Sequence, residues 1–84
     1  MYYVYLIQSI KFSQEHYVGF SEDLKTRITD HNDGKSIHTN KFKPWNLTCY
    51  FAFKNIQTAK KFEEYLKTGS GRAFLKKHLL EPLV

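Results

Sequence analysis

Two short runs of aromatic and β-branched residues near the start of the chain constrain its fold most. Residues 3–5 read YVY, residues 17–19 read YVG, and the polar residues 11–15 lie between them. Alternate side chains of a strand point to opposite faces, so Tyr3 and Tyr5 are expected to share one face. Two such runs separated by a polar connector predict a pair of neighbouring antiparallel strands, and we expect Tyr5 and Tyr17 to share one face of this hairpin.

A third strand is predicted over residues 45–53, WNLTCYFAF, where apolar and polar residues alternate. The alternation places five apolar residues on a single face: Trp45, Leu47, Cys49, Phe51 and Phe53. Cys49 belongs to this face, which favours a packing role over a catalytic thiol. The preceding residues 35–44 have no periodicity and are predicted to form a basic loop that ends at Pro44.

The first helix is predicted to begin at Ser21, whose hydroxyl can cap it, and to stop at Gly34. Its apolar stripe contains Ile28, and a step of about 100° per residue puts Arg27 and His31 on or beside that stripe. A cation and an imidazole are therefore expected to face the sheet. The structural alternative is an arginine at the edge of the core and a histidine satisfied by ordinary hydrogen bonds.

A second helix is predicted between Asn55, as its cap, and Gly69, as its stop. Its buried stripe consists of four residues: Ile56, Ala59, Phe62 and Leu66. Helical geometry places Glu63 within roughly 50° of the centre of this stripe and Glu64 about 150° away from it. An inward carboxylate needs a hydrogen bond, a metal or an ion pair, and a salt bridge to a nearby lysine is the structural alternative.

A last short helix is predicted to open at Ser70 and to end before Pro82. Four residues form its expected inward face: Phe74, Leu75, His78 and Leu79.

The whole chain has a formal net charge of +5, and its positive charge is concentrated in the second half. Residues 54–77 carry seven Lys or Arg against two Glu, whereas residues 1–24 carry one Lys against three acids. This asymmetry predicts a basic face that can follow phosphates, with a merely soluble surface as the alternative. Contacts to nucleic acid are predicted for five basic residues: Lys35, Lys41, Lys43, Lys67 and Arg72.

Several protein classes are excluded by composition. The single cysteine, Cys49, rules out an internal disulfide or a multi-cysteine zinc site, and the four histidines lack metal-ligand spacing. No apolar run approaches the length of a membrane span, and the first residues do not resemble a signal peptide. The sequence predicts a soluble cytoplasmic protein with one domain over residues 1–84.

An ordered set of motifs along almost the whole chain is similar to small stand-alone GIY-YIG proteins. The set consists of YVY, YVG, Arg27, HNDG at 31–34, HT at 38–39, PW at 44–45, and the Ala59, Glu63, Leu66, Lys67 spacing that runs into LKTGSGRAF. These proteins are related to the nuclease half of the bacterial excision-repair nuclease, so a bacterial source is expected. The resemblance implies an α+β fold with a three-stranded antiparallel sheet flanked by helices.

The resemblance also implies a site that hydrolyses phosphodiesters with one divalent ion, Mg²⁺ or Mn²⁺. Tyr5 and Tyr17 match the two motif tyrosines, Arg27 the phosphate-handling arginine, His31 an assisting histidine and Glu63 the metal ligand. A tyrosine would act as the base, although a free phenol with a pKa near 10 is a poor base at neutral pH. Arg27 and the metal must lower that pKa, or His31 must take the proton onward.

Two functions follow from the resemblance and its departures. The first is a metal-dependent DNA endonuclease, structure-selective or active in repair or recombination, with RNA left open as a substrate and a protein partner as a source of specificity. The second is a nucleic-acid-binding module of the same fold with weak or lost turnover. It is suggested by Tyr3, which replaces the first glycine of the family motif, and by Phe20, which stands where several relatives have a lysine.

Overall fold

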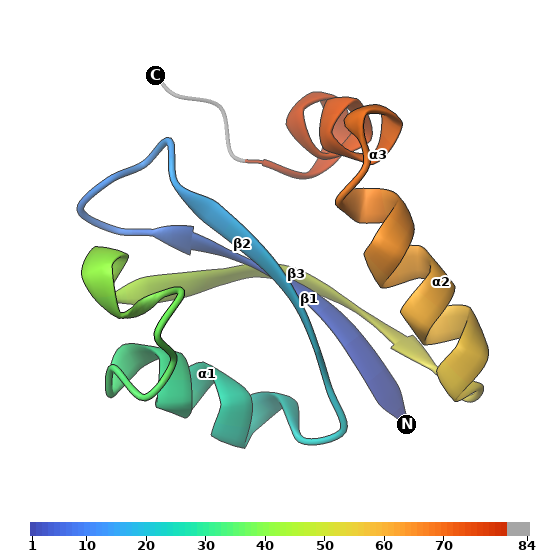
Figure 1. The fold of residues 1–84 in the computed structure, drawn as a ribbon, viewed down its shortest axis with the longest axis horizontal. Coiled ribbons are helices and arrows are strands. Elements are labelled where there is room, and N and C mark those ends of the chain that lie inside the picture. The colour runs from blue at the N-terminus through green and yellow to red at the C-terminus, as the bar shows by residue number, and fades with distance from the viewer. Residues whose placement is uncertain (81–84) are drawn as a thin grey trace.

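The computed structural model describes residues 1–80, and the predicted stop at Pro82 lies outside the described residues. The elements follow one another in the order drawn in Figure 1: β1 (Tyr2–Ser9), β2 (His16–Ser21), α1 (Leu24–Asn32), a 3₁₀ turn (Asn40–Phe42), β3 (Trp45–Phe53), α2 (Ile56–Leu66), α3 (Gly69–Phe74) and a π-helical turn (Leu75–Leu79). The predicted three-stranded α+β architecture is confirmed. No helix within residues 1–80 has the length and apolar character needed to span a membrane.

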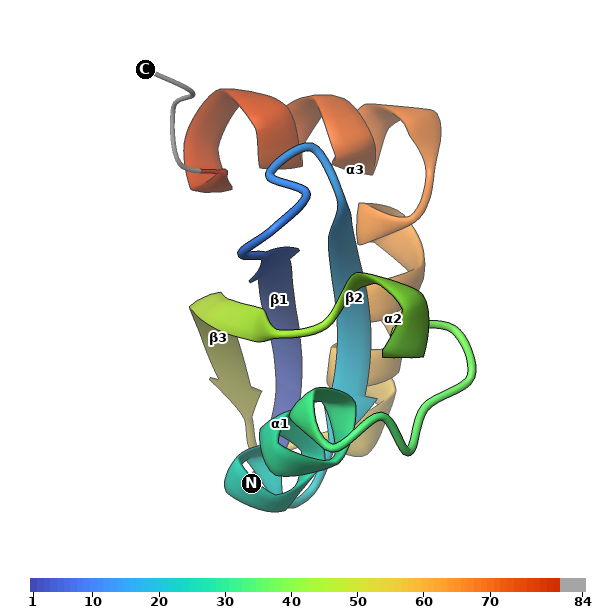
Figure 2. The same cartoon turned by 90° about the vertical axis from the view of Figure 1, so that its left-hand side faces the viewer.

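The sheet has the order β2-β1-β3, with both pairs antiparallel, so that β2 is an edge strand. Tyr5 pairs with Gly19, and Ile7 pairs with Tyr17. Because paired residues of neighbouring strands point to the same face, Tyr5 and Tyr17 share a face, as predicted. The sheet lies between α1 on one side and α2 with α3 on the other (Figure 1), and the view turned by 90° shows α1 in front of the strands and α2 behind them (Figure 2).

Each face of β1 belongs to a separate core. Val4 and Leu6 pack with Ala59 and Leu66 of α2. The opposite face carries a second buried cluster of Tyr5, Ile7 and Trp45, against which Leu24 and Ile28 of α1 pack. The strict alternation of β1 therefore supplies both layers of the domain.

A β-bulge in β3 breaks the alternation that the sequence predicts there. Leu6 pairs with Cys49 but Ile7 pairs with Leu47, so Thr48 is an extra residue between them. The prediction of one apolar face was wrong, because the inserted residue reverses which face each side chain takes. Trp45 packs with Tyr5, whereas Cys49 packs on the opposite face, where burial raises the pKa of its thiol.

The start of α1 also differs from the prediction. Asp23, rather than Ser21, is the N-cap, and its carboxylate accepts hydrogen bonds from the backbone N–H of Thr26 at 3.1 Å and from its hydroxyl at 2.8 Å. The Ser21 hydroxyl accepts from the Asp23 N–H at 2.9 Å and thereby shapes the turn before the helix. Gly34 has φ 77° just after the helix, so the predicted stop is confirmed.

The predicted cap of α2 is confirmed, but the boundary between α2 and α3 was wrong. Asn55 accepts hydrogen bonds from two backbone N–H groups of the first turn. The helix then ends at Leu66 rather than near Gly69, and Thr68 caps α3 by accepting from the Gly71 N–H at 3.1 Å. Ser70 is therefore inside α3.

Two residues predicted to face inward are exposed. Ile56 keeps 43% of its surface exposed because it is the first residue of α2, beyond the end of the sheet. His78 is exposed because the last turn is π-helical, with Leu80 N–H bonded to the Leu75 carbonyl, and this wider turn shifts the angular positions of its residues.

Candidate active site

A chain of hydrogen bonds joins three residues that come from three different segments. The Tyr5 hydroxyl of β1 lies 2.7 Å from Nε2 of His31 in α1, and Nδ1 of His31 lies 2.6 Å from Oγ1 of Thr39 in the following loop. All three residues are buried. The Trp45 indole N–H donates to the Thr39 carbonyl at 2.9 Å, which fixes the loop against the start of β3.

Sequence reasoning identified Tyr5 and His31 but did not name Thr39. The residue belongs to the HT pair at 38–39, which was part of the motif set, so a signal was present. Its role depends on a tertiary contact between a loop and a helix, and neither periodicity nor spacing encodes such a contact.

Burial determines the protonation state of this hydrogen-bonded chain. It lowers the pKa of His31 from 6.5 to about 4, and the nearby charge of Arg27 acts in the same direction. His31 is therefore neutral at pH 7, with one ring nitrogen as donor and the other as acceptor. In one tautomer Nδ1–H donates to Thr39 and Nε2 accepts the Tyr5 hydroxyl proton.

Burial also raises the pKa of Tyr5 to about 12, and this effect exceeds the opposing charge and hydrogen bonding of Arg27. Arg27 does lower the pKa of the Tyr5 phenol, as expected, but burial raises it more, so the pKa of Tyr5 is higher than that of a free phenol. Within the protein alone, burial opposes both routes left open by the sequence, because it disfavours a free phenolate at Tyr5 and an imidazolium at His31. Arg27 precedes His31 by one turn of α1, and its charge lowers the pKa of both Tyr5 and His31.

Gly19 is required for the position of Tyr5. The two residues are paired across β1 and β2, and a Cβ atom added to Gly19 would overlap the phenol oxygen of Tyr5. The glycine of YVG therefore makes room for the tyrosine of YVY.

Gly19→Ala is expected to destabilise the fold by about 1–3 kcal/mol, the usual cost of forcing an extra methyl group into a packed site. It should also displace the Tyr5 hydroxyl from His31. Urea unfolding measures the first effect, and the NMR signals of the His31 ring report the second. Gly69→Ala is the matched control, because no atom lies within 4 Å of its added Cβ. Equal stability of the two variants would contradict this account of Gly19.

Residues from the two faces of the sheet meet at the free edge of β2. The Tyr17 ring lies 5.3 Å from the His31 ring on one side, and the Lys67 ammonium of α2 stands 6.0 Å from the Tyr17 ring. Lys67 also forms an ion pair with Glu63 at 3.2 Å. Burial is the main cause of the raised pKa of Tyr5, and the negative charge of Glu63 adds the smallest contribution in the same direction.

The predicted orientations of the two neighbouring acids on α2 agree with the structure. The Glu63 side chain is 16% exposed and the residue Glu64 is exposed. The salt-bridge alternative for Glu63 is also observed, since Lys67 is its partner. A partner that is 51% exposed is weakly held, so the carboxylate can exchange it for another cation.

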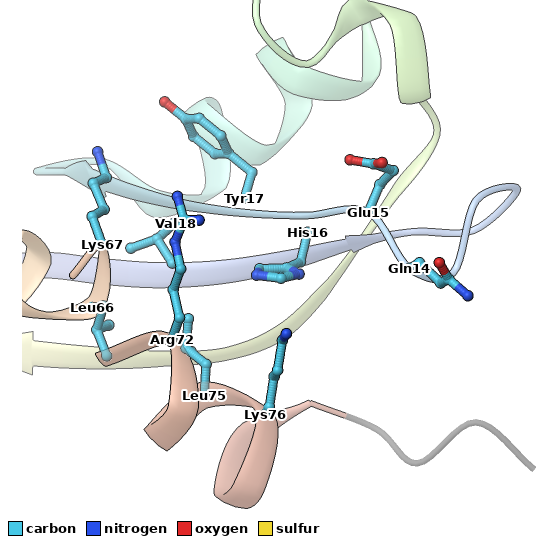
Figure 3. Close-up of a pocket in the computed structure, with 10 residues that line it drawn as sticks. All are labelled: Gln14, Glu15, His16, Tyr17, Val18, Leu66, Lys67, Arg72, Leu75 and Lys76. Carbon is cyan, nitrogen blue, oxygen red and sulfur yellow. The ribbon is translucent and has the colours of Figure 1, made fainter. Parts of the chain in front are cut away.

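The five basic residues predicted to contact nucleic acid fall into two groups. Lys35, Lys41 and Lys43 lie on the loop after α1, where Lys35 pairs with Asp30 at 3.7 Å. Lys67 and Arg72 instead line a cavity between β2 and α3 (Figure 3). The five therefore form no single cluster.

Glu63 is the site residue best suited to a divalent ion. Within residues 1–80, no group of three or more His, Cys, Asp or Glu side chains could hold a metal. A carboxylate oxygen is the ligand type that Mg²⁺ prefers, and Mg²⁺ commonly uses one or two carboxylates together with water and substrate phosphate. The donor set therefore fits a single ion whose coordination is completed by the substrate.

The pKa of His31 makes stability depend on pH. His31 takes up a proton near pH 4 in the folded protein and near pH 6.5 in the unfolded chain. The stability that neutral His31 contributes to the fold is therefore fully present above about pH 6.5 and is lost as the pH falls toward 4. The expected loss is about 3 kcal/mol, since each pKa unit corresponds to about 1.4 kcal/mol. Urea unfolding between pH 4 and 7 measures it.

Two variants separate His31 from the other titrating groups. His31→Gln should be less stable at pH 7 and should lose less stability on acidification, whereas His38→Gln, at an exposed position, should behave like the wild type. An unchanged pH dependence in His31→Gln would show that another group causes the loss.

Comparisons with known proteins agree with this arrangement. The model of the GIY-YIG catalytic domain family matches residues 1–77. A solution NMR structure of a UPF0213 protein from Bacillus halodurans is similar over 98% of this chain and 89% of its own, with 26% identity and a TM-score of 0.57. The search of curated proteins gave no match.

Proposed function

This chain belongs to the GIY-YIG catalytic domain family, and from that premise we propose that it is a divalent-metal-dependent endonuclease that hydrolyses phosphodiester bonds of DNA. One observation supports the proposal most. The buried Tyr5 hydroxyl of β1 is hydrogen-bonded to His31 of α1, and the charge of Arg27 from the same helix acts on both groups. A buried phenol and imidazole whose pKa values are both shifted by burial and by a nearby arginine are typical of a functional site.

The proposed proton path runs from water through Tyr5 to His31. The attacking water gives a proton to the Tyr5 oxygen while the Tyr5 hydroxyl proton passes to Nε2 of His31, 2.7 Å away. This coupled transfer avoids a free phenolate, which a pKa of about 12 makes scarce at neutral pH. His31 then becomes an imidazolium, which burial and Arg27 disfavour in the free protein and which the negative charge of a bound phosphate would stabilise, while Thr39 keeps its ring oriented through Nδ1.

Arg27 and Tyr17 are proposed to position the phosphate. The guanidinium of Arg27 offers paired N–H donors that match two phosphoryl oxygens, and its charge opposes the negative charge that develops in the transition state. Tyr17 stands at the edge of β2, where its ring borders both His31 and Lys67. Its hydroxyl is proposed to orient the water or the phosphate.

Glu63 would hold the divalent ion, Mg²⁺ or Mn²⁺. When bound, such an ion polarises the phosphoryl oxygens and stabilises the charge of the departing oxygen. Lys67 would release Glu63 and turn to the DNA phosphates, which is consistent with its exposure. The proposal extends to a cytoplasmic role in DNA repair or recombination, with RNA as the competing substrate and a protein partner as a source of specificity.

The second candidate is a binding module of the same fold without useful turnover. The ion pair between Glu63 and Lys67 favours it, because a carboxylate held by lysine binds a metal less readily. Phe20 also favours it, since Phe20 packs with the core on the α2 side and contributes no charge to the site.

Incubation with DNA distinguishes the two candidates. The purified chain is mixed with supercoiled, branched and single-stranded DNA in Mg²⁺, Mn²⁺ or EDTA, and products are resolved on gels. We expect cleavage that needs a divalent ion. Binding of these substrates without cleavage in either metal would instead support the module.

A further inference from the structure

A cavity of about 440 Å³ lies between the edge strand β2 and the helical segment after α2 (Figure 3). It adjoins the candidate active site, because Tyr17 and Lys67 line it and also border the His31 and Glu63 side chains. Its size falls within the range of about 300–1,000 Å³ typical of small-molecule sites. The cavity can therefore hold one small group next to the proposed reaction centre.

The charged residues that line this cavity are three cations, Lys67, Arg72 and Lys76, and one acid, Glu15. Figure 3 shows Arg72 and Lys76 extending from the helical segment toward β2, with Lys76 directed at the His16 ring. Within residues 1–80 the only ion pairs are those of Lys35 and Lys67, so neither Arg72 nor Lys76 is neutralised by an acid of the described chain. Two unpaired cations beside Lys67 favour a phosphate.

The inner wall of the cavity is apolar. Val18, Leu66 and Leu75 line it, and all three are core residues. An apolar wall beneath a cationic opening matches a nucleotide, whose base or sugar packs on apolar and aromatic surface while its phosphate meets Lys or Arg. A paired and stacked base in a duplex cannot enter such a hollow, because its faces are covered by the neighbouring bases and only its edges are exposed in the grooves.

We propose that this cavity binds one unpaired nucleotide adjacent to the phosphate that is cleaved. The proposal rests on the function proposed above and adds to it a substrate class, namely DNA with a single-stranded segment at the cleavage position. Arg72 and Lys76 bind the phosphate of that nucleotide, and the wall formed by Val18, Leu66 and Leu75 receives its base or sugar.

The test measures binding by the wild-type chain in EDTA, with gels to verify that the oligonucleotide stays intact. Fluorescence anisotropy gives the Kd for a labelled single strand and for the matching blunt duplex. The double variant Arg72→Gln/Lys76→Gln should weaken single-strand binding at least about tenfold, as expected for two charge-assisted contacts, and duplex binding much less. Lys54→Gln/Lys61→Gln is the matched control, because it removes the same charge at exposed positions outside the cavity.

Equal weakening of single-strand and duplex binding, or equal weakening by the two double variants, would overturn the proposal. NMR of the wild-type chain gives a second measurement that needs no substitution. A single-stranded oligonucleotide should shift the signals of His16, which lines the cavity, more than those of His78, which does not. Shifts confined to His78 would likewise overturn it. If the wild-type chain cuts DNA but binds single strands no better than duplexes, the nucleotide site is refuted and the nuclease proposal stands. If it prefers single strands but cuts no DNA, the nuclease proposal is refuted and the nucleotide site stands.

Discussion

Glu63→Gln is expected to lower the rate of DNA cleavage by about 10³-fold or more, because the loss of a metal site removes several kcal/mol of transition-state stabilisation. Glutamine keeps the size of the side chain and removes the charge that would hold the ion. The fold should survive, since the ion pair that is lost joins Glu63 to an exposed lysine. Single-turnover cleavage, thermal melts and DNA binding measure the three quantities.

Glu64→Gln is the matched control for this prediction. It changes the same charge on the neighbouring residue of α2, which points to solvent, and its cleavage rate should be close to that of the wild type. If both variants lost activity equally while remaining folded, Glu63 would not be the metal ligand.

Tyr5→Phe is expected to lower the cleavage rate by about 10²-fold or more, the scale of a lost general base. The substitution removes the Tyr5 hydroxyl, which is hydrogen-bonded to Nε2 of His31, while the aromatic ring stays packed. The variant should also lose about 1–3 kcal/mol of stability, since a buried ring nitrogen is left without its partner. Rates must therefore be compared well below its melting temperature.

Tyr17→Phe is the informative comparison. Figure 3 shows the Tyr17 hydroxyl directed away from the cavity, and the residue is only half-buried, so a smaller change in both stability and rate is expected. Cleavage by Tyr5→Phe at nearly the wild-type rate would remove Tyr5 from the proton path. A greater loss in Tyr17→Phe than in Tyr5→Phe would transfer the role of the base to Tyr17.

The parts of the fold that depend on local periodicity were predictable. The shared face of Tyr3 and Tyr5 follows from the period of two in a strand, and the opposite directions of Glu63 and Glu64 follow from the period of a helix. The elements and their order could be inferred for the same reason.

Features that depend on a single inserted residue or on a distant contact were not predictable. The extra Thr48 has no local signature, because WNLTCYFAF alternates without interruption in the sequence. The hydrogen bond from Thr39 to His31 exists only after the loop folds over α1. The choice of Asp23 over Ser21 as the cap is decided by which side chain reaches the Thr26 N–H.

Because of the bulge in β3, the number of residues in that strand affects the position of His31 in α1. Trp45 reaches the Tyr5 side of the sheet only because Thr48 is present, and its indole N–H then binds the carbonyl of Thr39, the residue that orients His31. Deletion of Thr48 would turn Trp45 to the opposite face and release that carbonyl. Insertions and deletions near the middle of β3 should therefore be tolerated only in pairs of residues, and a one-residue change there would alter the acid titration of His31 without touching it.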